Sequence, residues 1–254
     1  MPKTKKAIIR LDCVSKKYNE YGVEVKALDK ISLEIYPGEL VSVIGPSGCG
    51  KSTLLHCMGL LDRPSSGSVY IEGKDTSKIS GKEIALFRGE KLGFVFQNYN
   101  LIPRLTVLEN VMLPGLIMEK EVSRLKKKAL VLLKEVGIDH RADHKGIHLS
   151  GGEQQKAAIA RALINDPVLV LADEPTGALD SENSTEIMKL LVKMNEKRHA
   201  TFVFVSHDMH IASYGKRTIV LKDGRIIGDT KRNSKDSKKV LKNLAKQTGK
   251  REGR

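Results

Sequence analysis

The chain has 254 residues and a formal net charge of +14 at pH 7. This length suffices for one α/β domain with a full hydrophobic core, and no stretch approaches the roughly 18 apolar residues of a membrane-spanning helix. A basic excess can indicate nucleic-acid binding, but +8 of the charge falls on residues 231–254, which leaves +6 for the rest. The charge therefore predicts a basic tail and argues little for a nucleic-acid groove.

The cysteines and the first residues bear on the cellular compartment. Cys13, Cys49 and Cys57 have neither disulfide nor metal-ligand spacing, which favours a reducing environment. The apolar run at residues 7–9 is too short for a secretory leader. We therefore expect a cytoplasmic protein.

Alternating apolar residues predict strands at residues 8–18 and 27–35, and a β-branched run predicts a third at residues 40–44. Tyr18 closes the first of these strands. An aromatic ring in this position can stack on an adenine ring, or it can simply pack against its neighbours.

A glycine-rich loop follows the third strand and has the pattern G-x-x-x-x-G-K-S-T, which is typical of phosphate-binding loops. Its glycines let successive backbone N–H groups turn inward around an anion. Lys51 is expected to contact the β- and γ-phosphates, and the Ser52 hydroxyl to bind Mg²⁺. Apolar spacing predicts a helix over residues 52–61, as the motif requires, so we predict a nucleoside triphosphate site with Mg²⁺. The loop consists of Gly45, Pro46, Ser47, Gly48, Cys49, Gly50, Lys51, Ser52 and Thr53.

Further strands are predicted at residues 68–71 and 92–97. The second ends in Gln97, whose amide can hold a metal-bound water or sense a γ-phosphate, or can be an ordinary strand cap. Residues 98–103 are apolar for a loop, which suggests a partner surface. Residues 119–136 form an amphipathic helical pattern with Val122, Leu125, Ala129, Leu132, Leu133 and Val136 on one side.

His140, His144 and His148 recur every four residues. Gly146 interrupts the helical pattern that would bring them together, and no cysteine or acidic ligand set accompanies them. We expect surface histidines there and no metal site.

Residues 149–155 combine paired glycines with the start of a helix. Ser150 followed by Glu153 is a capping box. Gly151 and Gly152 at a helix N-terminus leave backbone N–H groups suited to an anion, although an ordinary capped helix explains the pattern equally well.

An apolar run at residues 168–174 predicts a parallel strand that delivers two carboxylates at its C-terminal end. Asp173 is then suited to binding Mg²⁺, and Glu174 to polarising the attacking water as a base. His207 follows another apolar strand at residues 201–206, where either a γ-phosphate sensor or a structural histidine is expected.

In chain order these motifs resemble the ATPase cassette of ABC transporters, specifically the group that serves lipoprotein release, macrolide export and antimicrobial-peptide export. The resemblance covers residues from about 9 to 228 and is most specific at the signature, residues 149–155. Residues 59–64, 94–97 and 172–181 favour that group. The resemblance rests on Tyr18, residues 45–53, Gln97, residues 149–155, Asp173, Glu174, residues 177–180 and His207.

The resemblance implies an α/β P-loop fold with a mixed core sheet, an antiparallel β lobe and a helical subdomain. It places the ATPase domain at residues 1–230, with the helical subdomain at about 98–163, and leaves residues 231–254 as the basic tail. It further implies a separate integral-membrane permease, which would hold the chain at the inner face of the cell membrane.

The resemblance also assigns roles. It implies that Tyr18 stacks on adenine, that Glu174 is the catalytic carboxylate, and that Gln97 and His207 contact metal, water and γ-phosphate. It implies a head-to-tail dimer in which Ser150 and Gly152 of one copy close over ATP held by the other. Lys156 departs from the arginine common in the family, keeping the charge but losing the planar fork.

Two alternative functions are a soluble ABC ATPase that acts on nucleic acid or ribosomes and a regulatory nucleotide binder. A soluble ABC ATPase acting on nucleic acid or ribosomes usually has two cassettes or a long coiled-coil insertion. This chain has one cassette, and residues 97–149 are too short to hold such an insertion. A regulatory nucleotide binder has no need of Glu174 and His207. We therefore predict ATP hydrolysis coupled to transport of a cargo that the permease selects. Residues 238–246 are either a solvated end or a basic amphipathic anchor for an anionic membrane surface.

Overall fold

The computed structural model describes residues 6–20 and 22–231, which form two compact units. The first unit takes the described residues up to Ser77 and those from Val203 onward, and the second takes Lys78–Phe202. The basic tail lies outside the described residues, except Lys231 at its first position.

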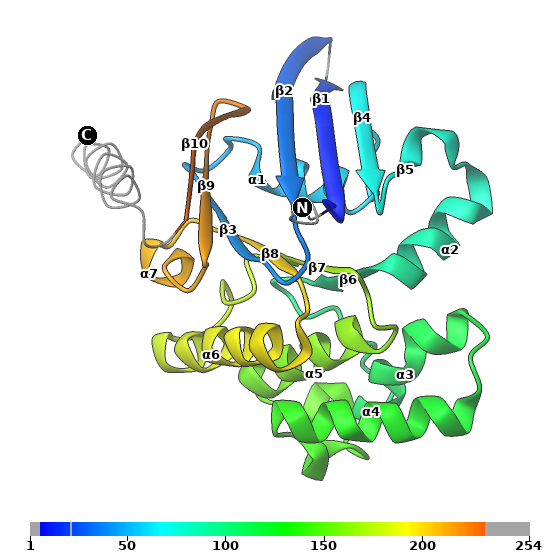
Figure 1. Cartoon of the computed structure of the whole chain (residues 1–254). Coiled ribbons are helices and arrows are strands. Elements are labelled where there is room, and N and C mark those ends of the chain that lie inside the picture. The colour runs from blue at the N-terminus through cyan, green and yellow to red at the C-terminus, as the bar shows by residue number, and fades with distance from the viewer. Residues whose placement is uncertain (1–5, 21, 232–254) are drawn as a thin grey trace, which may run out of the picture. The chain divides into compact units, whose positions relative to one another are not determined.

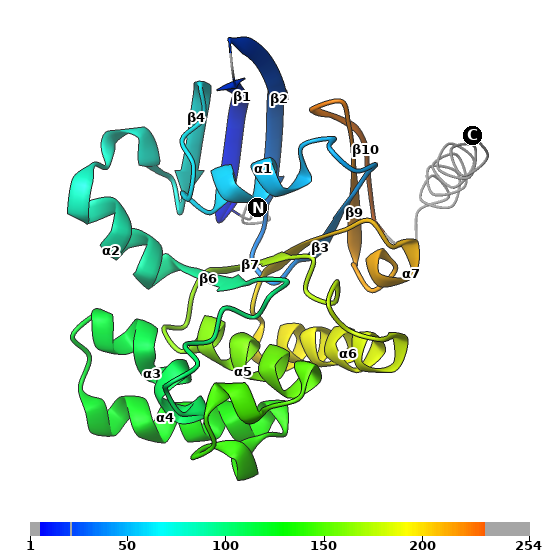
Figure 2. The ribbon, with the colours of Figure 1, turned by 180° about the vertical axis from the view of Figure 1, so that it is seen from behind.

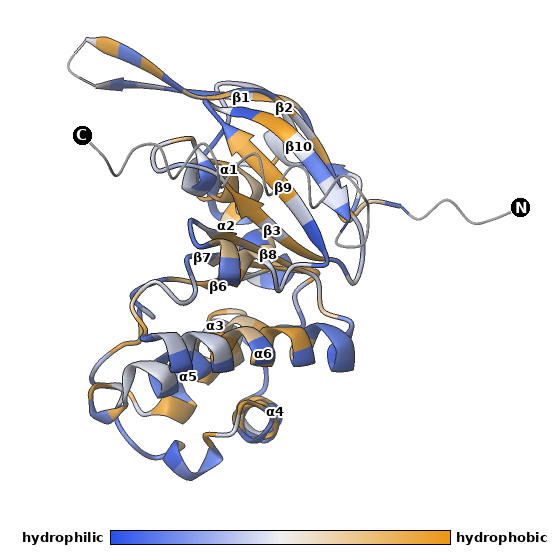
Figure 3. Ribbon diagram, turned by 90° about the vertical axis from the view of Figure 1, so that its left-hand side faces the viewer, coloured by the Kyte–Doolittle hydropathy of each residue, from blue (hydrophilic) through white to orange (hydrophobic). Residues whose placement is uncertain are grey.

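An antiparallel sheet in the first unit has the strand order β2-β1-β4-β5. These strands are β1 (Ile9–Glu20), β2 (Val23–Ile35), β4 (Ser66–Ile71) and β5 (Lys74–Asp75) (Figure 1). Along the second half of β2, buried Leu28, Ile31, Leu33 and Ile35 are interspersed with more exposed residues, which confirms the strand predicted at residues 27–35. The β1–β2 ribbon extends beyond the predicted ends, and hydrophobic and hydrophilic residues alternate along it in Figure 3.

The other strands of the first unit have the order β10-β9-β3-β8. They are β3 (Leu40–Ile44), β8 (Phe202–Ser206), β9 (Arg217–Lys222) and β10 (Arg225–Lys231). β3 pairs with β9 in parallel, and all five of its residues are buried, as is usual for strands of a parallel sheet. α1 (Lys51–Met58) follows β3, and α7 (Met209–Ala212) follows β8.

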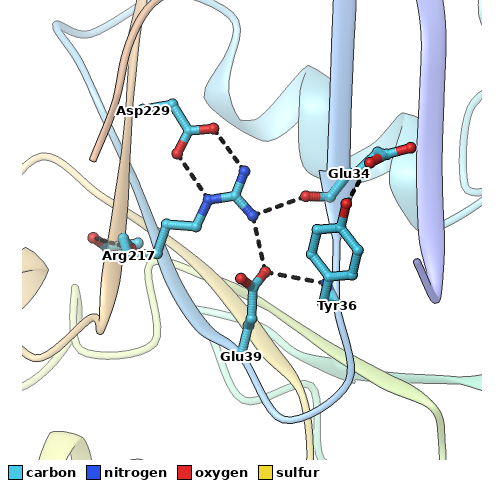
Figure 4. A network of polar contacts seen from close by, with 6 residues as sticks. Glu34, Tyr36, Glu39, Arg217 and Asp229 are labelled. Carbon is cyan, nitrogen blue, oxygen red and sulfur yellow. Dashed lines mark hydrogen bonds and ion pairs between the residues drawn. The ribbon is translucent and has the colours of Figure 1, made fainter. Parts of the chain in front are cut away.

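Arg217 joins three segments of the first unit (Figure 4). Its guanidinium forms a fork with both carboxylate oxygens of Asp229 on β10, at 2.6 and 2.7 Å, and also donates to Glu39 at 2.9 Å and to the Glu34 carbonyl at 2.8 Å. These carboxylates raise the pKa of Arg217 further above its usual value. The network holds the β9–β10 ribbon to β2 and to the turn that leads into β3.

In the second unit, β6 (Leu92–Val95) pairs in parallel with β7 (Leu169–Asp173). β6 is two residues shorter than predicted and leaves Gln97 beyond its end. The helices are α2 (Gly81–Lys91), α3 (Val107–Ile117), α4 (Val122–Val136), α5 (Gly151–Leu163) and α6 (Ser181–Arg198). α3, α4 and α5 pack on one another, as Figure 2 shows from behind.

α4 confirms the amphipathic prediction with two differences. It begins at Val122 rather than at residue 119, because Glu121 caps it by accepting the backbone N–H groups of Ser123 and Arg124. The predicted apolar side is buried except for Val122, which is 58% exposed. The helix ends at Gly137, whose left-handed backbone forms the C-cap.

The three histidines lie as predicted on the surface. Two short 3₁₀ turns, η2 (Asp139–Arg141) and η3 (Gly146–His148), replace a continuous helix there, and His140, His144 and His148 are all exposed. Within the described residues, no group of histidine, cysteine and acidic side chains is arranged to hold a metal ion.

Candidate functional site

The loop of residues 45–53 joins β3 to α1 and rests on neighbouring backbone in the first unit. A Cβ at Gly45 would lie 2.1 Å from the Leu221 carbonyl oxygen at the end of β9, so only glycine fits there. The Cys49 carbonyl accepts the N–H of Gly224 from the β9–β10 turn at 3.1 Å. Gly48 has a left-handed backbone (φ +74°) and nothing near its missing Cβ, which leaves that part of the loop open to a ligand.

Lys51 lies at the start of α1, is 7% exposed, and donates to the carbonyls of Gly45 and Pro46 at 2.9 Å each. Its ammonium is therefore held at the loop itself. The first turn of α1 contains no acidic residue, so the positive end of the helix dipole is not neutralised there. Burial raises the pKa of the Cys49 thiol, which favours its neutral form in the loop. Ser52 is exposed in this turn.

Tyr18 lies on β1 in the same unit and is partly exposed. Its hydroxyl donates to Asp62, which follows α1, at 2.7 Å. His207 also belongs to this unit and is exposed directly after β8. The turn that carries it is fixed by Ser206, whose hydroxyl accepts the N–H of Asp208 at 3.0 Å.

Asp173 is the last residue of β7, in the second unit, and Glu174 follows in a left-handed conformation (φ +43°), which is rare for a residue with a side chain. Two hydrogen bonds hold this turn: Gly177 N–H donates to the Glu174 carbonyl at 3.0 Å, and the buried Gln155 amide of α5 donates to the Pro175 carbonyl. These hydrogen bonds stabilise the strained backbone at Glu174. Strained backbone of this kind is common at active sites, where it orients a reacting side chain.

The signature forms the N-terminus of α5, and the predicted capping box is present. The Glu153 carboxylate accepts the Ser150 N–H at 2.9 Å, and the Ser150 hydroxyl accepts the Glu153 N–H at 3.3 Å. Arg141 donates to the other Glu153 oxygen at 2.8 Å. Burial raises the pKa of Glu153, but the hydrogen bonds from Ser150 and Arg141 outweigh it and leave the pKa below its usual value. Gly152 is buried, and a Cβ there would lie 2.8 Å from the Asn183 side chain.

Gln97 is exposed and lies beyond the end of β6. Its amide nitrogen lies 2.8 Å from where a Cβ on Gly177 would be. Two and three residues further on, Tyr99 and Asn100 both have positive φ, and the Arg161 guanidinium from α5 donates to both of their carbonyls. The Tyr99 hydroxyl lies 2.8 Å from where a Cβ on Gly151 would be. The segment after Gln97, the signature and residues 177–179 therefore meet within the second unit.

The structure groups the predicted residues by unit. Tyr18, residues 45–53 and His207 belong to the first unit, and Gln97, residues 150–152, Asp173 and Glu174 to the second. Lys156, the departure from the family pattern, forms an ion pair with Glu186 of α6 at 2.9 Å.

Sequence reasoning missed the supporting roles of four residues: Asp62, Arg141, Gln155 and Arg161. Arg161 carried a usable signal, because it is a lone charge among the apolar residues at 157–163. Asp62 lies within residues 59–64, which indicate the group but not a role for this residue. Gln155 belongs to the signature, but no local pattern predicts its contact with Pro175, and none predicts the contact of Arg141 with Glu153.

A glycine-rich loop between a buried parallel strand and a helix N-terminus defines a P-loop nucleotide-binding protein. Comparison with known proteins gives the family: residues 28–177 match the family model described as "ABC transporter". The chain belongs to the ABC transporter family, as an ATPase cassette that binds and hydrolyses ATP.

Three relatives illustrate the match. The ATP-binding protein MJ0796 of Methanocaldococcus jannaschii is 47% identical over 223 residues, covering 86% of this chain and 95% of that protein. Its dimeric structure bound to ADP and Pi has a TM-score of 0.80 at 45% identity and covers 89% of this chain and 99% of that one. The lipoprotein-releasing system ATP-binding protein LolD of Aquifex aeolicus is 46% identical over 225 residues, 89% of this chain and 98% of that protein.

The third is cbiO1 of Clostridium perfringens, described as part of the ABC transporter complex cbiONQ. Its structure has a TM-score of 0.82 at 30% identity and covers 97% of this chain and 96% of that one. The predicted fold class and group are confirmed by these relatives. In the part of the chain that the structure describes, no helix is long and apolar enough to cross a membrane.

Proposed function

We propose that two copies of this chain bind ATP between them head to tail and so power a separate membrane permease. The observation that carries this proposal is the anion-binding geometry at two helix N-termini, that of α1 with Lys51 and that of α5 with its capped signature. We further propose residues 1–230 as the ATPase domain and about 98–163 as its helical subdomain, which the packing of α3, α4 and α5 supports.

The phosphates would lie on the 45–53 loop. Lys51 would exchange its loop carbonyls for the β- and γ-phosphates, and the adenine would stack on Tyr18. Ser52, Gln97 and Asp173 would bind Mg²⁺; all three have the oxygen donors that this ion prefers, and it would neutralise charge on the phosphates.

Hydrolysis would use the strained turn after β7. Glu174 would accept a proton from the attacking water as the water oxygen bonds to the γ-phosphorus and the bond to the β–γ bridging oxygen breaks. His207 would donate to the γ-phosphate, and Gln97 would orient the water. The contacts of Gln155 and Gly177 that fix the turn support this role of Glu174.

The chemical part is tested by comparing two variants. Glu174→Gln should bind ATP as well as the unchanged protein and lower turnover by about 100-fold or more, because the base is lost. Lys51→Ala should instead abolish ATP binding, measured by calorimetry. Near-normal turnover in Glu174→Gln would remove Glu174 from the role of base.

Dimerisation follows from the signature. Gly151 and Gly152 would present their N–H groups, and Ser150 its hydroxyl, to the γ-phosphate of ATP held by the second copy. The Glu174→Gln protein should therefore dimerise with ATP and stay monomeric with ADP. Light scattering measures this, and the same mass in both nucleotides would contradict the proposal.

The permease would dock on the second unit and hold the chain at the cytoplasmic face of the membrane. Ile102 is 41% exposed and Ile147 is 60% exposed. The two residues lie on neighbouring segments, because the Leu101 side chain lies 3.5 Å from where a Cβ on Gly146 would be. Together they give the apolar loop at residues 98–103 a larger exposed surface. Co-purification of an integral membrane protein from membranes should succeed with the unchanged chain and fail with Ile102→Asp, with exposed Leu86→Asp as the control.

The basic tail, residues 231–254, would add contact with an anionic membrane surface, each surface-near basic residue being worth up to about 1 kcal/mol. Truncation after Thr230 should weaken sedimentation with anionic vesicles in a salt-sensitive way and leave ATP hydrolysis unchanged. Equal sedimentation of both forms would leave the tail as a solvated end.

A further inference from the structure

Lys16, Tyr18 and Asp62 form a polar cluster beside the phosphate-binding helix. The Asp62 carboxylate receives the Lys16 ammonium on one oxygen at 2.5 Å and the Tyr18 hydroxyl on the other at 2.7 Å. The Lys16 ammonium also donates to the Arg63 carbonyl at 2.8 Å and lies over the Tyr18 ring, 4.9 Å from its centroid. All of these residues belong to the first unit.

These contacts fix the plane of the Tyr18 ring. A tyrosine side chain has two main torsions, and anchoring the hydroxyl at one end of the ring while a cation covers one face leaves little freedom for either. Burial and the hydrogen bond to Asp62 raise the pKa of Tyr18 to about 12, so the phenol remains a donor. Burial raises the pKa of Asp62, but the Lys16 and Tyr18 hydrogen bonds outweigh it and keep the carboxylate charged.

Asp62 is also tied to the helix that bears the phosphate loop. The N–H groups of Leu61 and Asp62 both bond to the His56 carbonyl, so the segment folds back on the end of α1. α1 therefore presents the phosphate loop at its N-terminus and, just after its C-terminus, the carboxylate that anchors Tyr18. One rigid element thus sets the position of both.

The simplest alternative is that Lys16 and Asp62 are an ion pair that only stabilises the fold. Two observations favour an additional role in orienting Tyr18. The Tyr18 hydroxyl donates to a different Asp62 oxygen from the one that receives Lys16, and Tyr18 remains partly exposed even though its hydroxyl is anchored. A ring that is held at its edge and open to solvent is a preorganised surface for a flat partner.

We propose that Asp62 is a positioning residue for the nucleotide base, which anchors the Tyr18 ring in the orientation that stacks on it. The inference rests on the proposed role of Tyr18 as the adenine platform. It predicts that Asp62 affects only the part of nucleotide affinity that comes from the base. Stacking on an aromatic ring is worth about 5- to 150-fold in affinity, and loss of its anchoring should remove a part of that, about 3- to 10-fold.

The experiment uses the full chain and two ligands: ATP, and inorganic tripolyphosphate, which has the phosphates without the base. Dissociation constants are measured by displacement of a fluorescent ATP analogue. Asp62→Ala should weaken ATP binding by about 3- to 10-fold and leave tripolyphosphate binding unchanged. Asp12→Ala is the matched control, because Asp12 lies on β1, as Tyr18 does, and within the described residues its carboxylate pairs with the exposed Arg10, at 3.2 Å.

A second variant keeps the test valid if Asp62→Ala folds poorly. Tyr18→Phe removes the anchored hydroxyl and leaves the Lys16–Asp62 pair intact, so it should give the same selective loss. In the double variant the losses should not add, because both changes break one contact. Equal weakening of both ligands, or unchanged ATP binding in Asp62→Ala and Tyr18→Phe, would overturn the proposal.

The adenine platform itself is tested by Tyr18→Ala, which should bring ATP affinity close to that of tripolyphosphate. If Tyr18→Ala leaves ATP binding unchanged, adenine does not stack on Tyr18, and the proposed role of Asp62 is wrong as well. If Tyr18→Ala weakens ATP binding and the two anchoring variants do not, only the role of Asp62 is wrong.

Discussion

Substituting alanine for glycine in the phosphate loop should reveal two different reasons why glycine is needed. At Gly45 the backbone is ordinary, but the new Cβ would lie 2.1 Å from the Leu221 carbonyl oxygen and 2.7 Å from the Cys49 sulfur. At Gly48 the space is open, but φ is +74°. One substitution therefore tests close approach, and the other tests backbone strain.

The magnitudes differ accordingly. A non-glycine residue in the left-handed region costs about 1–2 kcal/mol, which is the expected loss for Gly48→Ala. For Gly45→Ala, the Leu221 backbone must retreat by about 1 Å, and overpacking of this kind costs about 1–3 kcal/mol, more when backbone has to move. Because Leu221 directly follows the parallel β3–β9 ladder, we expect about 3 kcal/mol or more.

The assay is urea unfolding without nucleotide, so that ligand binding does not contribute to the free energy of unfolding. The slope against urea should be the same in both variants. If Gly45→Ala loses no more stability than Gly48→Ala, the loop does not rest tightly on β9 and the reasoning is refuted.

Three further predictions concern unfolding free energies measured in the same way. Arg161→Lys keeps the charge but loses the fork that bonds two carbonyls, and should cost about 1–3 kcal/mol; an equally stable variant would show that the fork is not needed. Glu153→Gln keeps the capping acceptor but loses the ion pair to Arg141, and should cost about 0.5–1 kcal/mol at neutral pH. Because the folded-state pKa of Glu153 lies below 4.5, that difference should be constant above pH 4.5 and disappear as the pH falls through the folded-state value, whereas a difference that persists in acid would contradict this. Arg217→Met leaves the carboxylates of Asp229 and Glu39 in Figure 4 without their shared cation and should cost about 2–4 kcal/mol, which a loss below 1 kcal/mol would contradict.

Much of the secondary structure was predictable because its causes are local. The capping box at Ser150, the β-branched strand β3 and the apolar side of α4 each depend on residues within one turn or one strand of each other. α3 was not predicted, although its Thr106–Glu109 capping box is also local, because Pro114 interrupts its pattern. α6 was missed because its exposed face is strongly polar and weakens the apolar period.

The sequence by itself determined the chemistry of this protein. The order and spacing of the 45–53 loop, Asp173 and Glu174, and the signature specify an ABC ATPase, because each motif acts through backbone groups and side chains a few residues apart. Only the tertiary structure decided how these motifs are supported. The positive φ at Glu174, and the contacts of Arg161, Asp62 and Leu221 with residues 44 to 176 positions away, arise from pairings between distant segments. Such pairings depend on which elements pack together, and no local pattern in the chain records them.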